Sequence, residues 1–438
     1  MIRALIDHLW QSTLFGAAIW SITLALRSNA AAVRHWLWLL ASLKFLVPFS
    51  ALYLLGAAAG LFTPVETEPT LNTSDFRGLP PLTGAGYRIE PTVPVSGYYG
   101  HFTLKTDLGT VDAEGIQLLH QRVNEVKAAD ALEKMSTSDV FVSALAKSTA
   151  QSAESVGRAV SHPVDTLRAM PSGIGRLFGS ISKSVTDVAT DNDGGASSLN
   201  DSMGVGKARR QIAHQVGVDP YTSNPIVKKR LDSLSNAAFA GGVSFDVVFA
   251  VATGGAATAI SFTKTVSDIA WELPPADIRA RNQANLAALG VSQASTDALL
   301  NNTTYTPTLG LAFVEALKGL NVRDGADAFT QIASEAATEI EARFYINQLR
   351  MAGVYAKSER IDRIEIAGKF GGMHSGDKLF VPIPVDYLSW TEGVKAAAEG
   401  KKLEARERTL WLTGEASRRA REGLRQGRWT VREYAPVE

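Results

Sequence analysis

Two serines in this chain precede a lysine by three positions, Ser180 before Lys183 and Ser261 before Lys264. On a helix this spacing places the amine one turn from the hydroxyl, as in penicillin-recognising enzymes. The companion motifs S-D-N and K-T-G are absent, and so is the G-x-S-x-G motif of a nucleophile elbow. Short strings of this kind also arise by chance in a serine-rich chain. A serine hydrolase of the penicillin-recognising type is therefore the alternative hypothesis, and the leading hypothesis is a protein without catalytic activity.

The sequence has few residues suited to metal binding or thiol chemistry. The chain has no cysteine, which excludes disulfides, thiol nucleophiles and thiolate zinc sites. An H-E-x-x-H zinc helix needs two histidines one turn apart, and no two of the seven histidines meet that condition. They are His8, His35, His101, His120, His162, His214 and His374. We therefore expect no metal site and no cofactor.

Two acidic patterns could still hold a metal ion. Residues 187–203 resemble a calcium-binding loop only in part, because the positions of its first and last ligands are occupied by Ala189 and Asn200. This segment predicts an acidic, solvated loop. Glu335 and Glu339 share one face of a predicted helix, but without a partner histidine they indicate a solvated face.

The densest group of polar side chains lies in the segment GKFGGMHSGDKLFVP, residues 368–382. Side chains on a glycine-bracketed turn could line a site. However, Gly, Ser and Asp are also the residues that a hairpin turn selects, and adjacent His, Ser and Asp do not form a spatially assembled triad. We therefore interpret the segment as a β-hairpin. Its polar residues are Lys369, His374, Ser375, Asp377 and Lys378.

Two long apolar runs, residues 2–26 and 36–62, dominate the first part of the chain. Each is long enough to cross a hydrocarbon core of roughly 30 Å, which needs about 20 helical residues. The connection between them carries Arg27 and Arg34, and positive residues favour the cytoplasmic side. The pattern predicts a membrane hairpin with the rest of the chain outside the cytoplasm. A cleaved signal peptide is the alternative, but Asp7 interrupts the apolar core that it would need.

The strings DHLWQSTLF and LALRSNAAAVRHWLWLLASLKFLVPFS, within residues 1–57, resemble the N-terminal helix pair of the BlaR/MecR-type transmembrane zinc metallopeptidases, the antirepressors of β-lactam sensing. The resemblance implies two membrane-spanning helices and, in the family, a cytoplasmic protease domain with an H-E-x-x-H helix. That motif is absent here, so the resemblance extends to the helix pair alone. A remnant of a metallopeptidase without its zinc site is a further hypothesis. Lys44, in the second run, is expected to extend its amine toward the cytoplasmic face.

Beyond residue 62, predicted helices alternate with short β segments. Residues 63–88 are rich in Pro, Gly and Thr and predict a linker. Ile116, Leu119, Val123 and Val126 fall on one helical face. The predicted organisation is a small β element with long amphipathic helices in 89–190, a loop in 191–205, and a helical domain in 206–438 with a β element and a charged tail helix, the β elements lying near 89–112 and 361–390.

Three segments have more than one interpretation. Residues 174–188 form an amphipathic pattern that could pack on a core or lie in a membrane interface. Residues 238–262, with Asp246 inside, predict either a buried helix pair or a third membrane span. The tail, residues 393–427, mixes arginine with glutamate and predicts an ion-paired surface helix.

The 438 residues carry a net charge of zero, and 45% of them are hydrophobic. A neutral chain has no bulk attraction for nucleic acid, so no nucleic-acid partner is expected. We expect a mainly α-helical, membrane-anchored protein with two N-terminal transmembrane helices, in the bacterial inner membrane, with its C-terminal domain in the periplasm. The predicted function is binding, sensing or envelope organisation, with membrane lipid and an envelope protein as partners.

Overall fold

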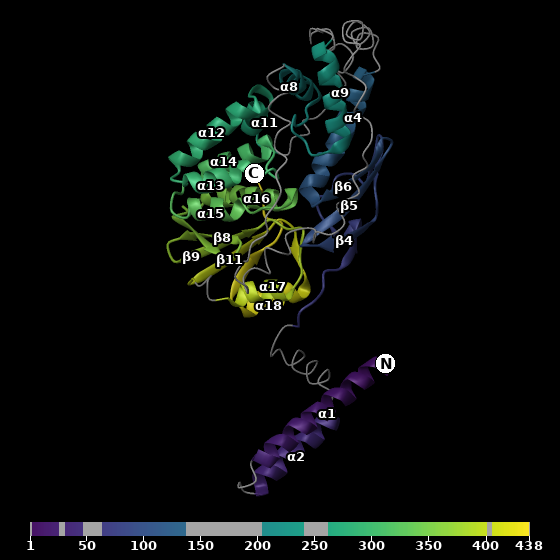
Figure 1. Ribbon diagram of the computed structural model, residues 1–438, viewed down its shortest axis with the longest axis vertical. Coiled ribbons are helices and arrows are strands. Elements are labelled where there is room, and N and C mark those ends of the chain that lie inside the picture. Colours follow the sequence, from purple (N-terminus) through teal and green to yellow (C-terminus); the bar gives the residue numbers. More distant parts are fainter. Residues whose placement is uncertain are drawn as a thin grey trace. The chain divides into compact units, whose positions relative to one another are not determined.

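Figure 1 shows a computed structural model of the protein, which describes residues 2–25, 31–46, 64–136, 204–240, 262–400 and 405–437. The chain forms two units, Met1–Pro64 and Val65–Glu438. The first unit contains helices α1 (Ile2–Ala25) and α2 (Ala31–Leu46), which lie against each other. Ser12, Ile19 and Ala41 are buried between them.

Within the described ranges, no helix is both long enough and apolar enough to cross a membrane. α2 has 16 residues, fewer than the roughly 20 that a span requires. α1 has 24 residues, but Arg3 and Asp7 lie in its first turns. The prediction of two transmembrane helices is therefore wrong, and so is the inner-membrane location with a periplasmic domain. Residues 47–62 of the second apolar run, and most of the segment 238–262, lie outside the described residues.

The second unit begins with an antiparallel sheet of six strands. Its order is β1-β4-β5-β3-β2, and β6 pairs with β5. Alternate residues of β4 and β5 point inward, and Val93, Phe102 and Leu104 form a core with Leu119 and Val123 of helix α4. The bounds are β1 Thr70–Asn72, η1 Thr73–Asp75, β2 Thr83–Gly84, β3 Tyr87–Ile89, β4 Thr92–Ser96, β5 Tyr99–Thr106, β6 Gly109–Glu114 and α4 Ile116–Ser136.

A second core joins the far half of α4 to α8 (Val205–Val216) and α9 (Pro225–Ala240). Leu132 of α4 and Leu231 of α9 are fully buried there. The segment between α8 and α9 crosses α4 near its middle, and polar residues of this segment contact α4. This arrangement also brings the 219–224 segment into contact with Thr308 and Glu339.

Six further helices form a layer above the C-terminal sheet (Figure 1). Four of them begin at a threonine or serine whose side chain accepts a hydrogen bond from a backbone N–H in the first turn, which satisfies one of the free donors there. Phe313, Phe329 and Tyr345 pack in their shared core. The helices are α11 Lys264–Glu272, α12 Pro275–Ala288, α13 Gln293–Asn301, α14 Pro307–Leu320, α15 Ala326–Ala333 and α16 Glu339–Ala356.

The C-terminal sheet has five strands in the order β13-β11-β9-β8-β7. Strands β7, β8 and β9 are antiparallel neighbours, whereas β9, β11 and β13 run parallel. The parallel connections pass through α17 and α18, because parallel strands need a crossover. The bounds are β7 Arg363–Ala367, β8 Phe370–Ser375, β9 Lys378–Ile383, β10 Tyr387–Leu388, α17 Glu392–Glu399, β11 Glu407–Leu412, β12 Glu415–Ala416, α18 Arg418–Gln426 and β13 Trp429–Arg432.

The expected fold class, a mainly helical protein with two transmembrane helices, is therefore wrong, whereas the β elements expected near 89–112 and 361–390 do occur there and extend beyond those ranges. Strands occur between Thr70 and Glu114 and again between Arg363 and Arg432, in sheets of six and five strands and a two-stranded parallel sheet of β10 and β12. Hydrophobic periodicity did not predict the first strands, because β1, β2 and β3 have only two or three residues each. Such short strands are too short to show a period-2 pattern. β11 and β12 lie within the charged segment 393–427, which suggested a single tail helix.

Candidate functional site

A cavity of about 530 Å³ lies where the N-terminal sheet, α4, α16 and the C-terminal sheet meet. We call it the junction cavity. Its walls come from segments that are far apart in the sequence: the end of β6 and the first turns of α4, one face of α16, the loops that follow β9 and β11, and residues 434–437. Such convergence of separate segments is common at small-molecule sites.

Asp386 lines the cavity from the loop between β9 and β10 and is 6% exposed. Its carboxylate accepts backbone hydrogen bonds from Gly100 at 3.0 Å and from Ile116, the first residue of α4, at 3.2 Å. Burial raises the pKa of Asp386 to about 7, although both backbone hydrogen bonds act to lower it. The Tyr99 hydroxyl donates to the Pro384 carbonyl in the same loop. These contacts join the N-terminal sheet and α4 to the C-terminal half of the unit.

Glu114 is the second carboxylate of the cavity wall and is the last residue of β6. Burial raises its pKa, and the nearby carboxylates of Glu339 and Glu341 add to this effect, whereas His101 opposes it. The imidazole Nδ1 of His101 lies 3.8 Å from Glu114 Oε1. Glu114 therefore takes up a proton more readily than a free glutamate.

Arg343 of α16 is the buried cation of the cavity, with 7% of its surface exposed. Its Nε donates to Glu339 Oε1 at 2.8 Å, and its Nη2 donates to Gln121 Oε1 at 2.9 Å. One turn later, Asn347 Nδ2 donates to Gln117 Oε1 at 2.7 Å. The two pairs connect α16 with α4 and hold the cavity-facing side chains in a defined position.

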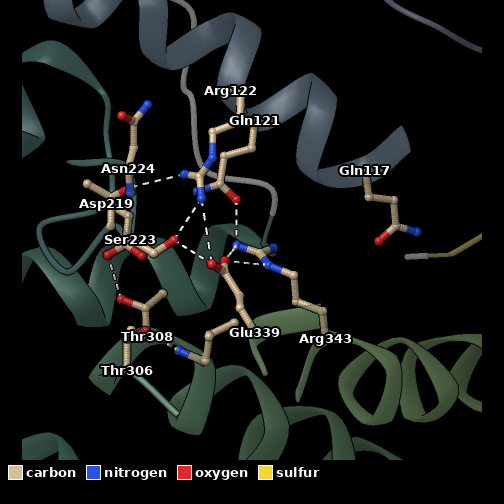
Figure 2. Close-up of polar contacts among 12 residues, drawn as sticks. Gln117, Gln121, Arg122, Asp219, Ser223, Asn224, Thr306, Thr308, Glu339 and Arg343 are labelled. Atoms are coloured by element: carbon tan, nitrogen blue, oxygen red, sulfur yellow. Dashed lines mark hydrogen bonds and ion pairs between the residues drawn. The ribbon is translucent and has the colours of Figure 1, made fainter. Parts of the chain in front are cut away.

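A second layer of polar residues supports Arg343 from behind (Figure 2). Ser223 Oγ donates to Glu339 at 2.5 Å, and Arg122 Nη2 donates to Ser223 at 2.7 Å. Arg122 itself lies 3.6 Å from Glu339. Burial acts to raise the pKa of Glu339, but the charges of Arg343 and Arg122 outweigh it and lower that pKa to about 2. Glu339 is therefore a permanent anion that fixes two arginines.

The same layer extends to two fully enclosed carboxylates. Glu125 has no exposed surface and accepts four hydrogen bonds, from Gln121, Arg122, Thr222 and Asn224, at 2.6–2.9 Å. Asp219 accepts from the Thr308 hydroxyl at 2.6 Å, and burial raises its pKa to about 6. A buried charge is tolerated when its hydrogen-bonding capacity is filled in this way. The network thus ties the 219–224 segment, α4, α14 and α16 together.

Positive charge accumulates along this face of α16. Arg350 lies one turn beyond Asn347, and its Nη1 donates to Asn347 Oδ1 at 3.3 Å. Burial lowers the pKa of Arg350 to about 10, and the charge of Arg343 lowers it further in the same direction. From the opposite side the exposed Arg77 also lines the cavity, with its guanidinium 4.7 Å from the centre of the Tyr434 ring.

The residues singled out from the sequence do not assemble into a catalytic site. Ser180, Lys183, Ser261, residues 187–203, residues 174–188 and Asp246 lie outside the described residues. Lys264 begins α11 and pairs with Asp268 at 2.5 Å. Glu335 pairs with Lys369, whereas Glu339 belongs to the network around Arg343. Across the described ranges, no group of three or more His, Asp or Glu side chains could hold a metal ion.

The segment 368–382 forms the predicted hairpin, β8 and β9, with Gly376 at a φ of 56° in the turn. Its polar side chains find separate partners: His374 lies 2.7 Å from Glu365, and Lys378 lies 2.6 Å from Glu359. The cluster therefore serves the hairpin and not a common site. In the charged tail, the predicted helix is divided into α17, β11, β12 and α18, and Arg421 of α18 pairs with Glu433 at 2.8 Å.

No family model, no curated protein and no solved structure matches the chain in comparisons with known proteins. The resemblance of residues 1–57 to the BlaR/MecR-type metallopeptidases stays a prediction, since none of these comparisons tests it.

Proposed function

We propose that the unit Val65–Glu438 is a binding module that takes a small polar molecule into the junction cavity. The volume of about 530 Å³ lies within the range of small-molecule sites, roughly 300–1,000 Å³. The observation that carries the proposal is Arg343, a buried arginine at the cavity wall that Glu339 and Gln121 hold on two sides. A polar side chain positioned in this way by its neighbours is typical of binding sites.

Binding is favoured over nucleophilic catalysis because the Tyr99 and Thr413 hydroxyls and the Asp386 carboxylate of the cavity are already engaged. The Tyr99 hydroxyl donates to Pro384, the Thr413 hydroxyl donates to Val385, and both Asp386 oxygens accept backbone hydrogen bonds. A nucleophile would need a neighbouring base within hydrogen-bonding reach, whereas the lining hydroxyls of Tyr99 and Thr413 donate to backbone carbonyls. A serine hydrolase stays an untested alternative, since Ser180 and Ser261 lie outside the described residues. A sensing role would use the same cavity, and a protein partner stays a prediction.

The test is a thermal-unfolding screen of the purified chain against a library of small metabolite-like molecules. A ligand at 100 times its dissociation constant adds about 2.7 kcal/mol to the stability of the folded state. Gln117→Trp, which fills the cavity, should abolish the stabilisation seen with the wild type. Lys127→Trp places the same side chain on the exposed face of α4 and should keep it. A ligand that stabilises Gln117→Trp as much as the wild type would show that it binds elsewhere and would contradict the proposal.

A further inference from the structure

We infer that the ligand of the junction cavity carries a carboxylate or phosphate group, which Arg343 and Gln117 receive together. The inference rests on the proposed function, because it assigns a chemical class to the ligand of the same cavity. It follows from which polar atoms of the cavity wall already have a hydrogen-bonding partner in the protein and which do not.

At Arg343 and Gln117 the hydrogen-bonding atoms that are left over are donors. Arg343 uses Nε and Nη2 to bind Glu339 and Gln121, and its Nη1 makes no hydrogen bond to any residue in the described part of the chain. Gln117 uses Oε1 to accept from Asn347, so its Nε2 donor is left over. Both atoms lack a partner among the described residues, but neither is fully enclosed, so solvent can reach both of them. A ligand bound at these two residues must therefore supply acceptors.

The acceptors of Asn347, Gln117 and Asp386 are occupied, whereas the Glu114 carboxylate accepts no hydrogen bond from the described residues. Asn347 Oδ1 accepts from Arg350, and Gln117 Oε1 accepts from Asn347 Nδ2. Asp386 receives the backbone N–H groups of Gly100 and Ile116. A neutral hydroxyl ligand needs both donors and acceptors from its site, whereas an oxyanion needs donors alone. The arrangement therefore suits an oxyanion better than a sugar or an amide.

The charges around the wall favour an anion as well. Arg343 and Arg350 lie two turns apart on α16, and their mutual repulsion contributes to the lowered pKa of Arg350. The exposed Arg77 adds a third cation at the other side of the cavity. Guanidinium groups bind carboxylates and phosphates through charge-assisted hydrogen bonds, which are stronger than neutral ones. An oxyanion at Arg343 would relieve the repulsion between the two α16 arginines.

The competing ligand class is a cation at Glu114. This carboxylate lines the cavity, but its pKa is raised, so it binds protons more readily than a free glutamate and holds its negative charge less firmly. The nearby carboxylates of Glu339 and Glu341 contribute to that shift. Glu339, in turn, is neutralised by Arg343 and Arg122. A cationic ligand is therefore the specific outcome that would overturn the inference.

The experiment is isothermal titration of the full chain with matched probes: succinate and glucose 6-phosphate as anions, glucose as the neutral analogue, and putrescine as the cation. We expect an anionic probe to bind and Gln117→Glu to weaken it at least 10-fold. Gln117→Glu keeps the Oε1 that accepts from Asn347 and replaces only the free donor by a negative charge, so the variant should fold. Gln331→Glu makes the same change on the exposed face of α15 and should leave the affinity within two-fold.

The outcomes separate this inference from the proposed function. If glucose or putrescine binds, is blocked by Gln117→Trp, and neither anion binds, the cavity is a binding site of another class and the inference fails alone. If an anion binds but Gln117→Glu and Gln331→Glu weaken it equally, it binds away from the cavity, and the inference again fails. Loss of anion binding in both Gln117 variants, with Gln331→Glu unchanged, supports both.

Discussion

Gln121 and Arg343 are 222 residues apart in the chain, yet the side-chain oxygen Oε1 of Gln121 accepts a hydrogen bond from Arg343 Nη2 at 2.9 Å. The bond fixes a guanidinium that also binds Glu339 and faces the junction cavity. One turn away on each helix, Gln117 and Asn347 repeat the contact. The proposed binding function depends on this pairing, because it determines where the free donors of the wall point.

Removal of the charge that anchors Arg343 should be costly. Glu339→Gln leaves Arg343 and Arg122, both nearly buried, without their shared carboxylate, so the free energy of unfolding should fall by about 3 kcal/mol at pH 7. The measurement is urea denaturation followed by circular dichroism. Glu335→Gln, at the more exposed ion pair with Lys369 in the turn between α15 and α16, is the matched control and should cost about 1 kcal/mol or less. Equal losses in the two variants would contradict the anchoring role.

The effect of Glu339→Gln should also depend on pH. The pKa of Glu339 is lowered to about 2 from 4.5. Its ionised form therefore stabilises the folded state fully above about pH 4.5, and this contribution is lost as the pH falls toward 2. The difference in unfolding free energy between the wild type and Glu339→Gln should shrink over that window. A difference that stays constant from pH 7 to pH 2.5 would count against the ion pair.

Asp386 should give the opposite dependence. Burial raises its pKa from 3.8 to about 7. Between these values the folded protein keeps a proton that the unfolded chain releases, so stability falls as the pH rises from about 4 to about 7, by up to about 1.4 kcal/mol per pH unit. Asp386→Asn removes this contribution and should gain stability relative to the wild type across the window. Asp377→Asn, in the exposed β8–β9 turn, should follow the wild type. Parallel curves for all three proteins would refute the role of burial.

Position 414 requires a glycine, because its backbone lies very close to the loop that carries Asp386. A Cβ atom at Gly414 would overlap the backbone carbonyl group of Asp386. Gly414→Ala should therefore destabilise the protein by at least about 1–3 kcal/mol, the usual cost of overpacking. Gly353→Ala, in helix α16 where the space is open, should instead be neutral or stabilise by up to about 1 kcal/mol. Thermal unfolding of the two variants checks the contrast.

Arg77 offers a test of charge at the cavity rim. It is exposed and stacks on Tyr434, so Arg77→Ala should change stability by no more than about 0.5 kcal/mol. It should weaken an anionic ligand several-fold at low salt, and less at high salt, because exposed charges are screened. Arg88→Ala, an exposed arginine of β3 outside the cavity lining, should leave the affinity unchanged. An equal effect of both variants would point to a non-specific charge effect.

The parts of the fold that the sequence predicted are those with a local signal. The apolar face of Ile116, Leu119, Val123 and Val126 does lie on a helix, α4. Glycine-rich turn chemistry predicted the β8–β9 hairpin correctly. The membrane hairpin was wrong, because hydropathy alone defined runs that the described helices do not match in length or apolar character.

The binding residues could not have been found in the same way. Gln117 and Gln121 lie one turn apart on α4, a spacing that also describes an ordinary solvated face. Their partners Asn347 and Arg343 are more than 220 residues away in the chain, at separations of 230 and 222. The one usable signal was Glu339 together with Arg343 at i and i+4, which predicts an ion pair but not its burial. Only the tertiary arrangement turns these residues into a cavity wall.

The contacts of Gln117 with Asn347 and of Gln121 with Arg343 determine how α16 is aligned along α4. As the residue number rises along α4, it falls along α16, so the two helix faces run antiparallel where they meet. If α16 slid by one turn, Asn347 would face Gln121 or Arg343 would face Gln117, and one residue of each pair would lose its partner. Only one register satisfies all four side chains. The two hydrogen bonds thus fix the axial position of α16 relative to α4. A ligand that binds Arg343 would depend on that position.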